Sequence, residues 1–270
     1  MTPANERVAA AHLKGQITAK SYVDGISQSV VLPVVDLLRA PNENRNRQLL
    51  IGADVTVFET HEGWAFVQAA DGYVGYLRAD ALGAQGKPTH SVATPATHVY
   101  EGEDFKSPDL MHLSFGARVE VLDERRKFYE TTLGYISKRH LRPLDRPFSD
   151  PVTVAQMHFG VPYLWGGNSI CGIDCSGLVA ASLTACGMTS PADSDQQCDI
   201  LGDPLDDDAS LQRGDLMFWK GHVGLMVDDQ TLIHANAHHM STAYEPIDAA
   251  ILRIAAQGDG PVTARKRIMG

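Results

Sequence analysis

The first 145 residues of the chain contain an internal repeat. The run at 50–57, Leu-Ile-Gly-Ala-Asp-Val-Thr-Val, aligns with the run at 114–121, Ser-Phe-Gly-Ala-Arg-Val-Glu-Val. The ends of the repeats also match, because Gly-Tyr-Leu at 75–77 corresponds to Gly-Tyr-Ile at 134–136. Such self-similarity is typical of tandem copies of one structural unit. The front of the chain is therefore expected to form two modules of about sixty residues each.

Both modules are predicted to be β-structure. Short runs rich in β-branched and aromatic residues, such as 54–58 and 64–68, are separated by Gly, Pro and Asp. This pattern is typical of the strands of a small barrel or sandwich. The short links between segments favour modules packed against one another, and Val8–Leu13 could form a short helix. The predicted boundaries are an N-terminal segment 1–28, modules at 29–83 and 90–145, and a rear domain at 150–270.

The rear domain has an α/β pattern. Apolar residues at helical spacing predict a helix over 152–159, and the proline and glycines of 161–167 exclude a helix from the next segment. From Ser176 an apolar pattern at helical spacing continues to Gly187, a residue type that commonly follows a helix C-terminus. Cys175 is therefore predicted to lie in the first turn of a helix.

Charge and composition argue against two classes of partner. The chain has 270 residues, 44% of them hydrophobic, so it is long enough to bury its own cores. Its formal net charge of −10 disfavours nucleic acids and anionic membrane surfaces, since both select basic patches. Charged residues interrupt the first thirty positions, which therefore hold no apolar run of signal-peptide or membrane-spanning length. We expect a cytoplasmic protein.

The four cysteines are predicted to be reduced and to bind no metal. Cys171, Cys175, Cys186 and Cys198 are clustered in the sequence, which suits neither a chain-wide disulfide framework nor a secreted fold. Cys175 and Cys186 would lie about 16 Å apart along one helix, too far for a single zinc ion to bridge. We expect no metal and no cofactor, and only packing roles for the three cysteines other than Cys175.

Cys175 and two later histidines could form a nucleophilic site. A helix N-terminus carries free amide donors and about half a positive charge, so it is expected to lower the pKa of a cysteine placed there. The runs 221–227 and 231–236 predict a hairpin centred near residue 229. This register places His222 and His234 diagonally on one face, close enough for His234 to orient His222.

Taken singly, these residues have simpler interpretations. A lone cysteine at a helix start more often packs than reacts, and a strand histidine is usually a hydrogen-bonded core group. Their combination favours chemistry. The other histidines are predicted to be inert surface groups: His12, His61, His90, His98, His112, His158, His238 and His239.

Five motifs in order along the rear domain resemble the NlpC/P60 cysteine peptidases. They are Pro-Tyr-Leu-Trp-Gly-Gly at 162–167, Asp-Cys-Ser-Gly-Leu at 174–178, Arg-Gly-Asp-Leu at 213–216, Gly-His-Val-Gly at 221–224 and His-Ala-Asn at 234–236. The front modules resemble the bacterial SH3 domains that accompany this catalytic domain. The resemblance implies an α+β fold, with a papain-like NlpC/P60 domain preceded by two small SH3-like β-barrels.

The resemblance also implies roles for individual residues. Cys175 would be the nucleophile, His222 the general base and His234 the residue that orients it, with Tyr163 beside the thiol. The implied substrate-binding residues are Asp174, Ser176, Trp165 and Ser194, with Glu59 and Tyr73 from the front as matches by pattern. One departure is Ala192, which stands where the family commonly has arginine, and altered specificity is expected from it more than lost catalysis.

The implied activity is hydrolysis of the γ-D-glutamyl to diamino acid bond in short murein peptides, L-Ala-γ-D-Glu-diamino acid, with a free N-terminal amine. An intracellular enzyme of this kind would recycle imported cell-wall peptides. Two alternatives remain open, a remodelling endopeptidase on intact peptidoglycan and a non-catalytic protein that binds wall peptides. The sequence does not fix the diamino acid or the oligomeric state.

Overall fold

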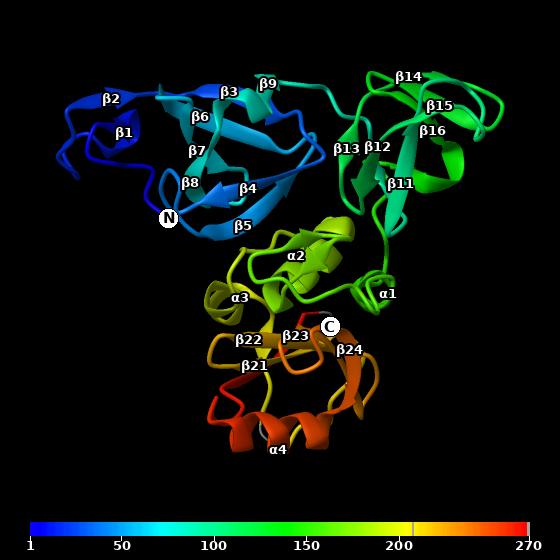
Figure 1. Ribbon diagram of the computed structural model, residues 1–270. Coiled ribbons are helices and arrows are strands. Elements are labelled where there is room, and N and C mark those ends of the chain that lie inside the picture. The colour runs from blue at the N-terminus through cyan, green and yellow to red at the C-terminus, as the bar shows by residue number, and fades with distance from the viewer. Residues whose placement is uncertain (207, 269–270) are drawn as a thin grey trace. The chain divides into compact units, whose positions relative to one another are not determined.

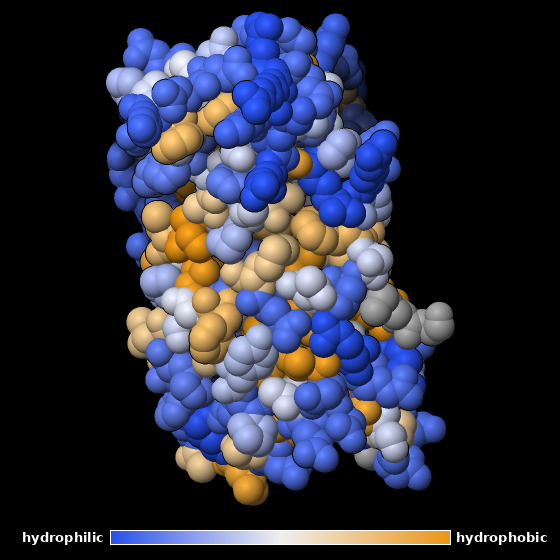
Figure 2. All heavy atoms as spheres, turned by 90° about the vertical axis from the view of Figure 1, so that its right-hand side faces the viewer, coloured by the Kyte–Doolittle hydropathy of each residue, from blue (hydrophilic) through white to orange (hydrophobic). Residues whose placement is uncertain are grey.

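The computed structural model describes residues 1–206 and 208–268, which form two compact units, Met1–Arg146 and Pro147–Gly270 (Figure 1). The boundary falls between the predicted second module and the predicted rear domain. In the part of the chain that is described, no helix is both long and apolar enough to cross a membrane. Hydrophilic side chains cover much of the face seen in Figure 2, as expected for a chain with 21% charged residues.

The first repeat forms a seven-stranded antiparallel sheet of order β5-β4-β8-β7-β6-β3-β9. Tight turns such as Glu62-Gly63, where both residues have positive φ, connect its neighbouring strands. Its elements are β3 (Ile26–Val30), β4 (Val34–Leu38), β5 (Arg45–Leu50), β6 (Asp54–His61), β7 (Trp64–Ala69), β8 (Val74–Arg78), the 3-10 turn η2 (Ala79–Ala81) and β9 (Leu82–Ala84).

The segment before this sheet differs from its prediction. Val8–Leu13 does not form one helix. It divides into the strand β1 (Val8–Ala10), which pairs with β2 (Ser21–Val23), and the single turn η1 (Ala11–Leu13). Val8 and Leu13 are buried in a cluster that includes Phe58 and Phe66 of the sheet. Packing against the sheet therefore overrides a local pattern too short to sustain a helix.

The second repeat has a similar succession of elements in two smaller sheets, of order β13-β10-β17 and β12-β11-β16-β15-β14, with the short strands β13 and β14 where the first repeat has β6 alone. A register shift between Leu37 and Leu38 in the first repeat recurs between Val99 and Tyr100 in the second. The elements are β10 (His90–Val92), β11 (Ala96–Tyr100), β12 (Asp109–Ser114), β13 (Arg118–Val119), β14 (Val121–Glu124), β15 (Phe128–Thr131), β16 (Gly134–Ser137), η3 (Lys138–His140) and β17 (Leu141–Pro143).

The two repeats pack against one another, as their short links predict. Leu50 and Ile51 of the first repeat share a buried cluster with Val92 and Leu141 of the second. The N–H of Arg118 donates to the carbonyl oxygen of Ile51 at 3.0 Å, which joins the two copies of the repeated motif. The front of the chain is therefore one compact unit built from two similar halves.

The rear unit is a six-stranded sheet of order β20-β25-β21-β22-β23-β24, with helices on both faces (Figure 1). Alternate residues of β21 pack into a core with α2 on one face and into a core with α4 on the other. The strands are β18 (Asn168–Ser169), β19 (Gly172–Ile173), β20 (Asp203–Pro204), β21 (Asp215–Trp219), β22 (His222–Met226), β23 (Thr231–Asn236), β24 (Ser241–Pro246) and β25 (Ala264–Arg267). The helices are α1 (Pro151–Gln156), α2 (Cys175–Ala185), α3 (Ser194–Ile200) and α4 (Ile247–Gln257).

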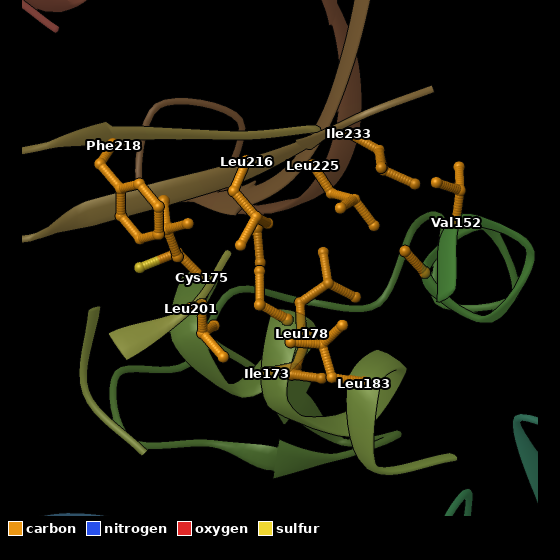
Figure 3. Packing of buried hydrophobic residues seen from close by; sticks show 14 of the residues in the cluster. Val152, Ile173, Cys175, Leu178, Leu183, Leu201, Leu216, Phe218, Leu225 and Ile233 are labelled. Carbon is orange, nitrogen blue, oxygen red and sulfur yellow. The ribbon is translucent and has the colours of Figure 1, made fainter. Parts of the chain in front are cut away.

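The helix α2 is the buried element that carries the cysteine. Leu178 and Leu183 are each 1% exposed and pack on the strands β21, β22 and β23 (Figure 3). The helix ends before Gly187, whose φ of 78° is the left-handed conformation that glycine adopts readily at a helix end. The prediction of this helix is confirmed. The predicted helix over 152–159 is shorter than expected, because α1 ends at Gln156 and Phe159 is 60% exposed.

Candidate active site

The first turn of α2 is held by its N-cap residue. The Asp174 carboxylate accepts the N–H of Gly177 and the N–H of Gly166, each at 2.7 Å. A Cβ at Gly177 would lie 2.7 Å from the carbonyl oxygen of Gly167, so the loop approaches the helix closely only because this residue is glycine. Asp174 therefore joins the Trp-Gly-Gly loop to the start of α2 and fixes the backbone around Cys175.

Cys175 is buried, at 7% exposure, and lies beside Phe218 of β21 (Figure 3). Burial, together with the negative charge of Asp174, raises the pKa of the thiol to about 12, while the backbone N–H groups of Val223 and Ser176 favour its anion. The expected lowering of this pKa is therefore wrong, because loss of hydration outweighs the helix N-terminus. The resting thiol keeps its proton and needs a base when it attacks.

The predicted hairpin register is confirmed. Leu225 pairs with Ile233 and Met226 with Leu232, so the hairpin is centred on residue 229. His222 Nε2 and His234 Nδ1 lie 2.9 Å apart in a hydrogen bond. The Val223 N–H lies close enough to the Cys175 sulfur to favour its anion, so the start of β22, which carries His222, lies near the thiol.

Both imidazoles are neutral at neutral pH. Burial is the main cause that lowers the pKa of His222 to about 4, and the charge of Arg253 acts in the same direction. Burial and the neighbouring His222 lower the pKa of His234 to about 3. A neutral imidazole can accept a proton, so His222 has the protonation state that a general base requires.

Two further residues of this network were not found from the sequence. Glu245 Oε2 lies 3.1 Å from His234 Nε2, and Arg253 donates to both oxygens of the same carboxylate. Glu245 lies on β24, where Leu232 is its cross-strand partner, and Arg253 lies on α4. The only local signal was a carboxylate in a strand next to the hairpin, because the register of β24 against β23 is a tertiary feature.

Tyr163 lies close to the nucleophile. It bridges to Ile173, two residues before Cys175. Burial raises the pKa of Tyr163 to about 12, and the negative charge that Cys175 carries as a thiolate and that of Asp174 add to this effect. The phenol therefore keeps its proton at neutral pH and can donate a hydrogen bond, as an oxyanion-stabilising group requires.

The other predicted residues of the rear unit lie in α2, in α3 and in the loop before β18. Ser176 is buried in the first turn of α2, with its hydroxyl 3.3 Å from an Asp174 oxygen, and Trp165 is 59% exposed. Ser194 is the first residue of α3. Gln197, which sequence reasoning missed, is fully buried and donates to the carbonyl oxygens of Ser176 and Pro191, so it ties α3 to the turn that carries Cys175.

The two residues predicted from the front unit have partners within that unit. Glu59 forms an ion pair with Arg7 and also accepts a hydrogen bond from Asn5. Tyr73 is 7% exposed, and the Arg47 guanidinium lies 5.6 Å from the centre of its ring. A substrate amine would have to compete with Arg7 for the Glu59 carboxylate. A role for either residue in substrate binding stays a prediction.

One histidine prediction is wrong. His158 is 3% exposed, not a surface group, and its Nδ1 bonds the Val154 carbonyl oxygen at 3.0 Å. It lies just past α1, on the face that packs against the rest of the unit, so it is a core histidine. Its pKa is lowered by burial.

Two groups among the described residues bring three metal-binding side chains together. His98, Asp109 and His112 are exposed on the hairpin of β11 and β12. His234, His239 and Glu245 form the second group, but there Arg253 already neutralises the carboxylate and would repel a cation. Neither group includes a cysteine, and all four cysteines are free.

A buried thiol at a helix start lies near the strand that carries a neutral imidazole, and this imidazole is hydrogen-bonded to a second one. Such a combination is typical of a thiol hydrolase site. Residues 160–252 match the NlpC/P60 family, and residues 37–82 match the bacterial dipeptidyl-peptidase Sh3 domain. The "Probable endopeptidase NlpC" of Escherichia coli is 33% identical over 109 residues, which are 35% of this chain and 70% of that protein. The chain belongs to the NlpC/P60 family and is a cysteine peptidase with an SH3 domain.

Two further similarities extend over most of the chain. The "Gamma-D-glutamyl-L-lysine dipeptidyl-peptidase" of Bacillus cereus is 27% identical over 236 residues, covering 74% of this chain and 70% of that protein. An NlpC/P60 family protein from Bacillus cereus, solved as a crystal structure, has a TM-score of 0.76 at 21% identity and covers 91% of this chain and 100% of that one. This structural likeness supports the α+β fold, with both strands and helices in the expected parts.

Replacing Tyr163 by phenylalanine tests the phenol as an oxyanion donor. Tyr163→Phe is expected to lower kcat roughly 10- to 100-fold with little change in KM, because the hydrogen bond strengthens only as the oxyanion forms. Steady-state kinetics on a peptide substrate measure both kcat and KM. Tyr244→Phe is the matched control, because Tyr244 is an exposed tyrosine on β24 that stacks on Phe159. Equal kcat values for Tyr163→Phe and the wild type would contradict this role.

Proposed function

We propose that the protein hydrolyses the γ-D-glutamyl to diamino acid bond of short peptidoglycan peptides with a free N-terminal L-alanine, releasing L-Ala-D-Glu. The observation that carries the proposal is the similarity to a protein named for γ-D-glutamyl-L-lysine dipeptidyl-peptidase activity. That similarity covers 74% of this chain, whereas the rear unit holds only 124 of its 270 residues, so the similarity extends into the front unit. The proposal is further supported by the hydrogen bond between His222 and His234 and by the position of Cys175 near the start of β22, the strand that carries His222.

The proposed reaction begins with the Cys175 sulfur attacking the γ-carbonyl carbon of D-glutamate while His222 takes the thiol proton. The oxyanion is placed to accept hydrogen bonds from backbone N–H groups at the start of α2 and from the Tyr163 hydroxyl. His222 then gives its proton to the leaving amine, the C–N bond breaks, and a thioester to Cys175 remains. Water, deprotonated by His222, attacks the thioester and restores the free thiol.

We assign substrate contacts to four residues of the rear unit: Asp174, Ser176, Trp165 and Ser194. We also propose that residues 90–145 form a second SH3-like module, since their elements follow a similar order to those of the first repeat. The domain boundaries of the proposal are those predicted from the sequence. Altered specificity from Ala192, in place of the family's common arginine, is part of the same proposal.

We extend the proposal to recycling of wall peptides in the cytoplasm. The competing role within the same enzyme class is remodelling of intact peptidoglycan. Cell fractionation followed by detection of the protein tests the location. If the protein recycles wall peptides, we expect to detect it in the cytoplasmic fraction. Detection of the protein in the cell-wall fraction would contradict this role.

The activity is tested with L-Ala-γ-D-Glu-diaminopimelate, the L-lysine counterpart, the N-acetylated form of each and purified sacculi. Products are identified by mass, and Cys175→Ala is the control for contaminating peptidases. The proposal expects L-Ala-D-Glu to be released only from the peptides with a free amine. Comparing the rates for the diaminopimelate and L-lysine peptides shows which diamino acid is preferred. Cleavage of sacculi would favour remodelling, and cleavage of no substrate would overturn the proposed activity.

A further inference from the structure

We propose that Glu245, held in place by Arg253, is a positioning residue that fixes the tautomers of both active-site histidines, so that His222 presents an unprotonated Nδ1 to the Cys175 thiol. The inference rests on the assignment of Cys175 as nucleophile and His222 as base. It goes beyond the proposed substrate, because it concerns how the base acquires the correct tautomer. The network joins β22, β23, β24 and α4 in one line of contacts.

The first step concerns the direction of the bond between His234 and Glu245. An ionised carboxylate can only accept hydrogen bonds. Arg253 donates through Nε to Oε1 at 2.8 Å and through a terminal nitrogen to Oε2 at 2.7 Å, which keeps Glu245 in this form. His234 Nε2, at 3.1 Å from Oε2, must therefore be the donor.

The second step concerns the direction of the hydrogen bond between His234 and His222. A neutral imidazole has one N–H, so His234 with its proton on Nε2 leaves Nδ1 as an acceptor. The 2.9 Å contact between His234 Nδ1 and His222 Nε2 then requires the proton on His222 Nε2. The remaining ring nitrogen of His222, Nδ1, is left without a proton and can take the one on the thiol.

Because these groups are buried, the hydrogen bonds must run from His222 to His234 and from His234 to Glu245. His234 is completely buried and Glu245 is 8% exposed, so solvent cannot satisfy a misdirected N–H. Among the hydrogen bonds of the described residues, none joins the adjacent ring of His239 to His234 or to Glu245, and its Nδ1 bonds Asn236 Oδ1 at 3.0 Å. The opposite tautomers would place two N–H groups against each other between the rings. Glu245 thus acts through His234 without touching the reacting atoms.

Two variants distinguish the role of Glu245 as a hydrogen-bond acceptor from the role of its negative charge. Glu245→Met combined with Arg253→Met removes the acceptor without leaving a buried unpaired arginine. This double variant is expected to lower kcat roughly 10- to 100-fold with a smaller change in KM. Glu245→Gln can keep an amide oxygen at the position of Oε2 and is expected to retain most of the activity. Cys175 should be alkylated by iodoacetamide more slowly in the double variant than in the wild type, and Glu245→Gln should react at nearly the wild-type rate. This measurement does not depend on which peptide is the substrate.

The matched control is the other buried arginine–carboxylate pair of the same sheet. Arg267 donates to both oxygens of Asp215, which is 1% exposed, but this pair has no contact to either histidine among the hydrogen bonds of the described residues. Asp215→Leu combined with Arg267→Met should therefore cost comparable stability while leaving the alkylation rate of Cys175 at the wild-type value. An equal loss of reactivity in both double variants would show a merely structural effect and overturn the proposal.

The tautomers themselves are measured on the wild-type protein by nitrogen-15 NMR of the imidazole rings. The proposal expects the proton on Nε2 in both His222 and His234. A proton on Nδ1 of His234 would overturn it, even if the peptide substrate proved correct. Conversely, the expected tautomers combined with no cleavage of γ-D-glutamyl peptides would leave the inference standing and reject the proposed substrate.

Discussion

The Cys175→Ala variant is expected to lose peptide hydrolysis by a factor of roughly 10⁴ or more in kcat, because it removes the thiol proposed to form the covalent intermediate. Cys175 lies at the start of α2, with Tyr163 and the Val223 amide near it. The variant should remain folded, since alanine is smaller and its helix turn is held by Asp174. Steady-state kinetics and thermal unfolding measure the two properties on one sample.

Cys198→Ala is the matched control for this loss. Cys198 is a partly buried free cysteine that packs against the same core as Cys175 but lies on α3. Its removal is expected to alter stability slightly and to leave kcat near the wild-type value. Wild-type activity in Cys175→Ala, or an equal loss in Cys198→Ala, would contradict the assignment of the nucleophile.

The second large effect is expected at the base. His222→Ala should lower kcat roughly 10³- to 10⁴-fold, because the pKa of the buried thiol, raised to about 12, leaves almost no thiolate at neutral pH without an adjacent acceptor. His238→Ala, on the nearby exposed turn, should have almost no effect. Added imidazole is expected to restore part of the lost activity, and a variant as active as the wild type would contradict a role for His222.

The pH profile of the wild type follows from the same residue. Burial lowers the pKa of His222 from 6.5 to about 4, so the base stays unprotonated from neutral pH down to mildly acidic pH. Activity is therefore expected to persist below pH 6 and to be lost as the pH falls through about 4, where His222 takes up a proton. An acid limb near pH 6.5 in kcat/KM would indicate a base that is not buried in the free enzyme.

Local pattern was sufficient to predict several parts of the structure. The repeat at 50–57 and 114–121 predicts two similar modules, and both copies show a strand register shift at equivalent positions. The two apolar runs 221–227 and 231–236, with the short polar turn between them, place the centre of the hairpin near residue 229, which is the centre that the pairing of β22 and β23 has. The helix α2 is bounded by signals that lie within a few residues of its ends, Asp174 and Gly187.

The features that could not be predicted depend on distant parts of the chain. Glu245 meets His234 only because β24 pairs beside β23, and Arg253 reaches it from α4. The pKa of Cys175 depends on how completely the core around Leu216 and Phe218 covers the sulfur, and that burial reverses the shift expected from the helix terminus alone. The segment Val8–Leu13 has a local pattern consistent with a helix, but its packing partners are strands.

The most direct test of covalent catalysis by Cys175 is the partition of the acyl group between water and hydroxylamine. Wild-type enzyme is given the free-amine peptides that end in L-lysine and in diaminopimelate, and the products are separated by mass. If both peptides form the same thioester, hydroxylamine should convert part of it to the γ-hydroxamate of L-Ala-D-Glu while water gives the free acid. The ratio of hydroxamate to free acid should then be the same for both peptides. Formation of the free acid alone, or a ratio that changes with the leaving amine, would contradict an acyl-enzyme on Cys175.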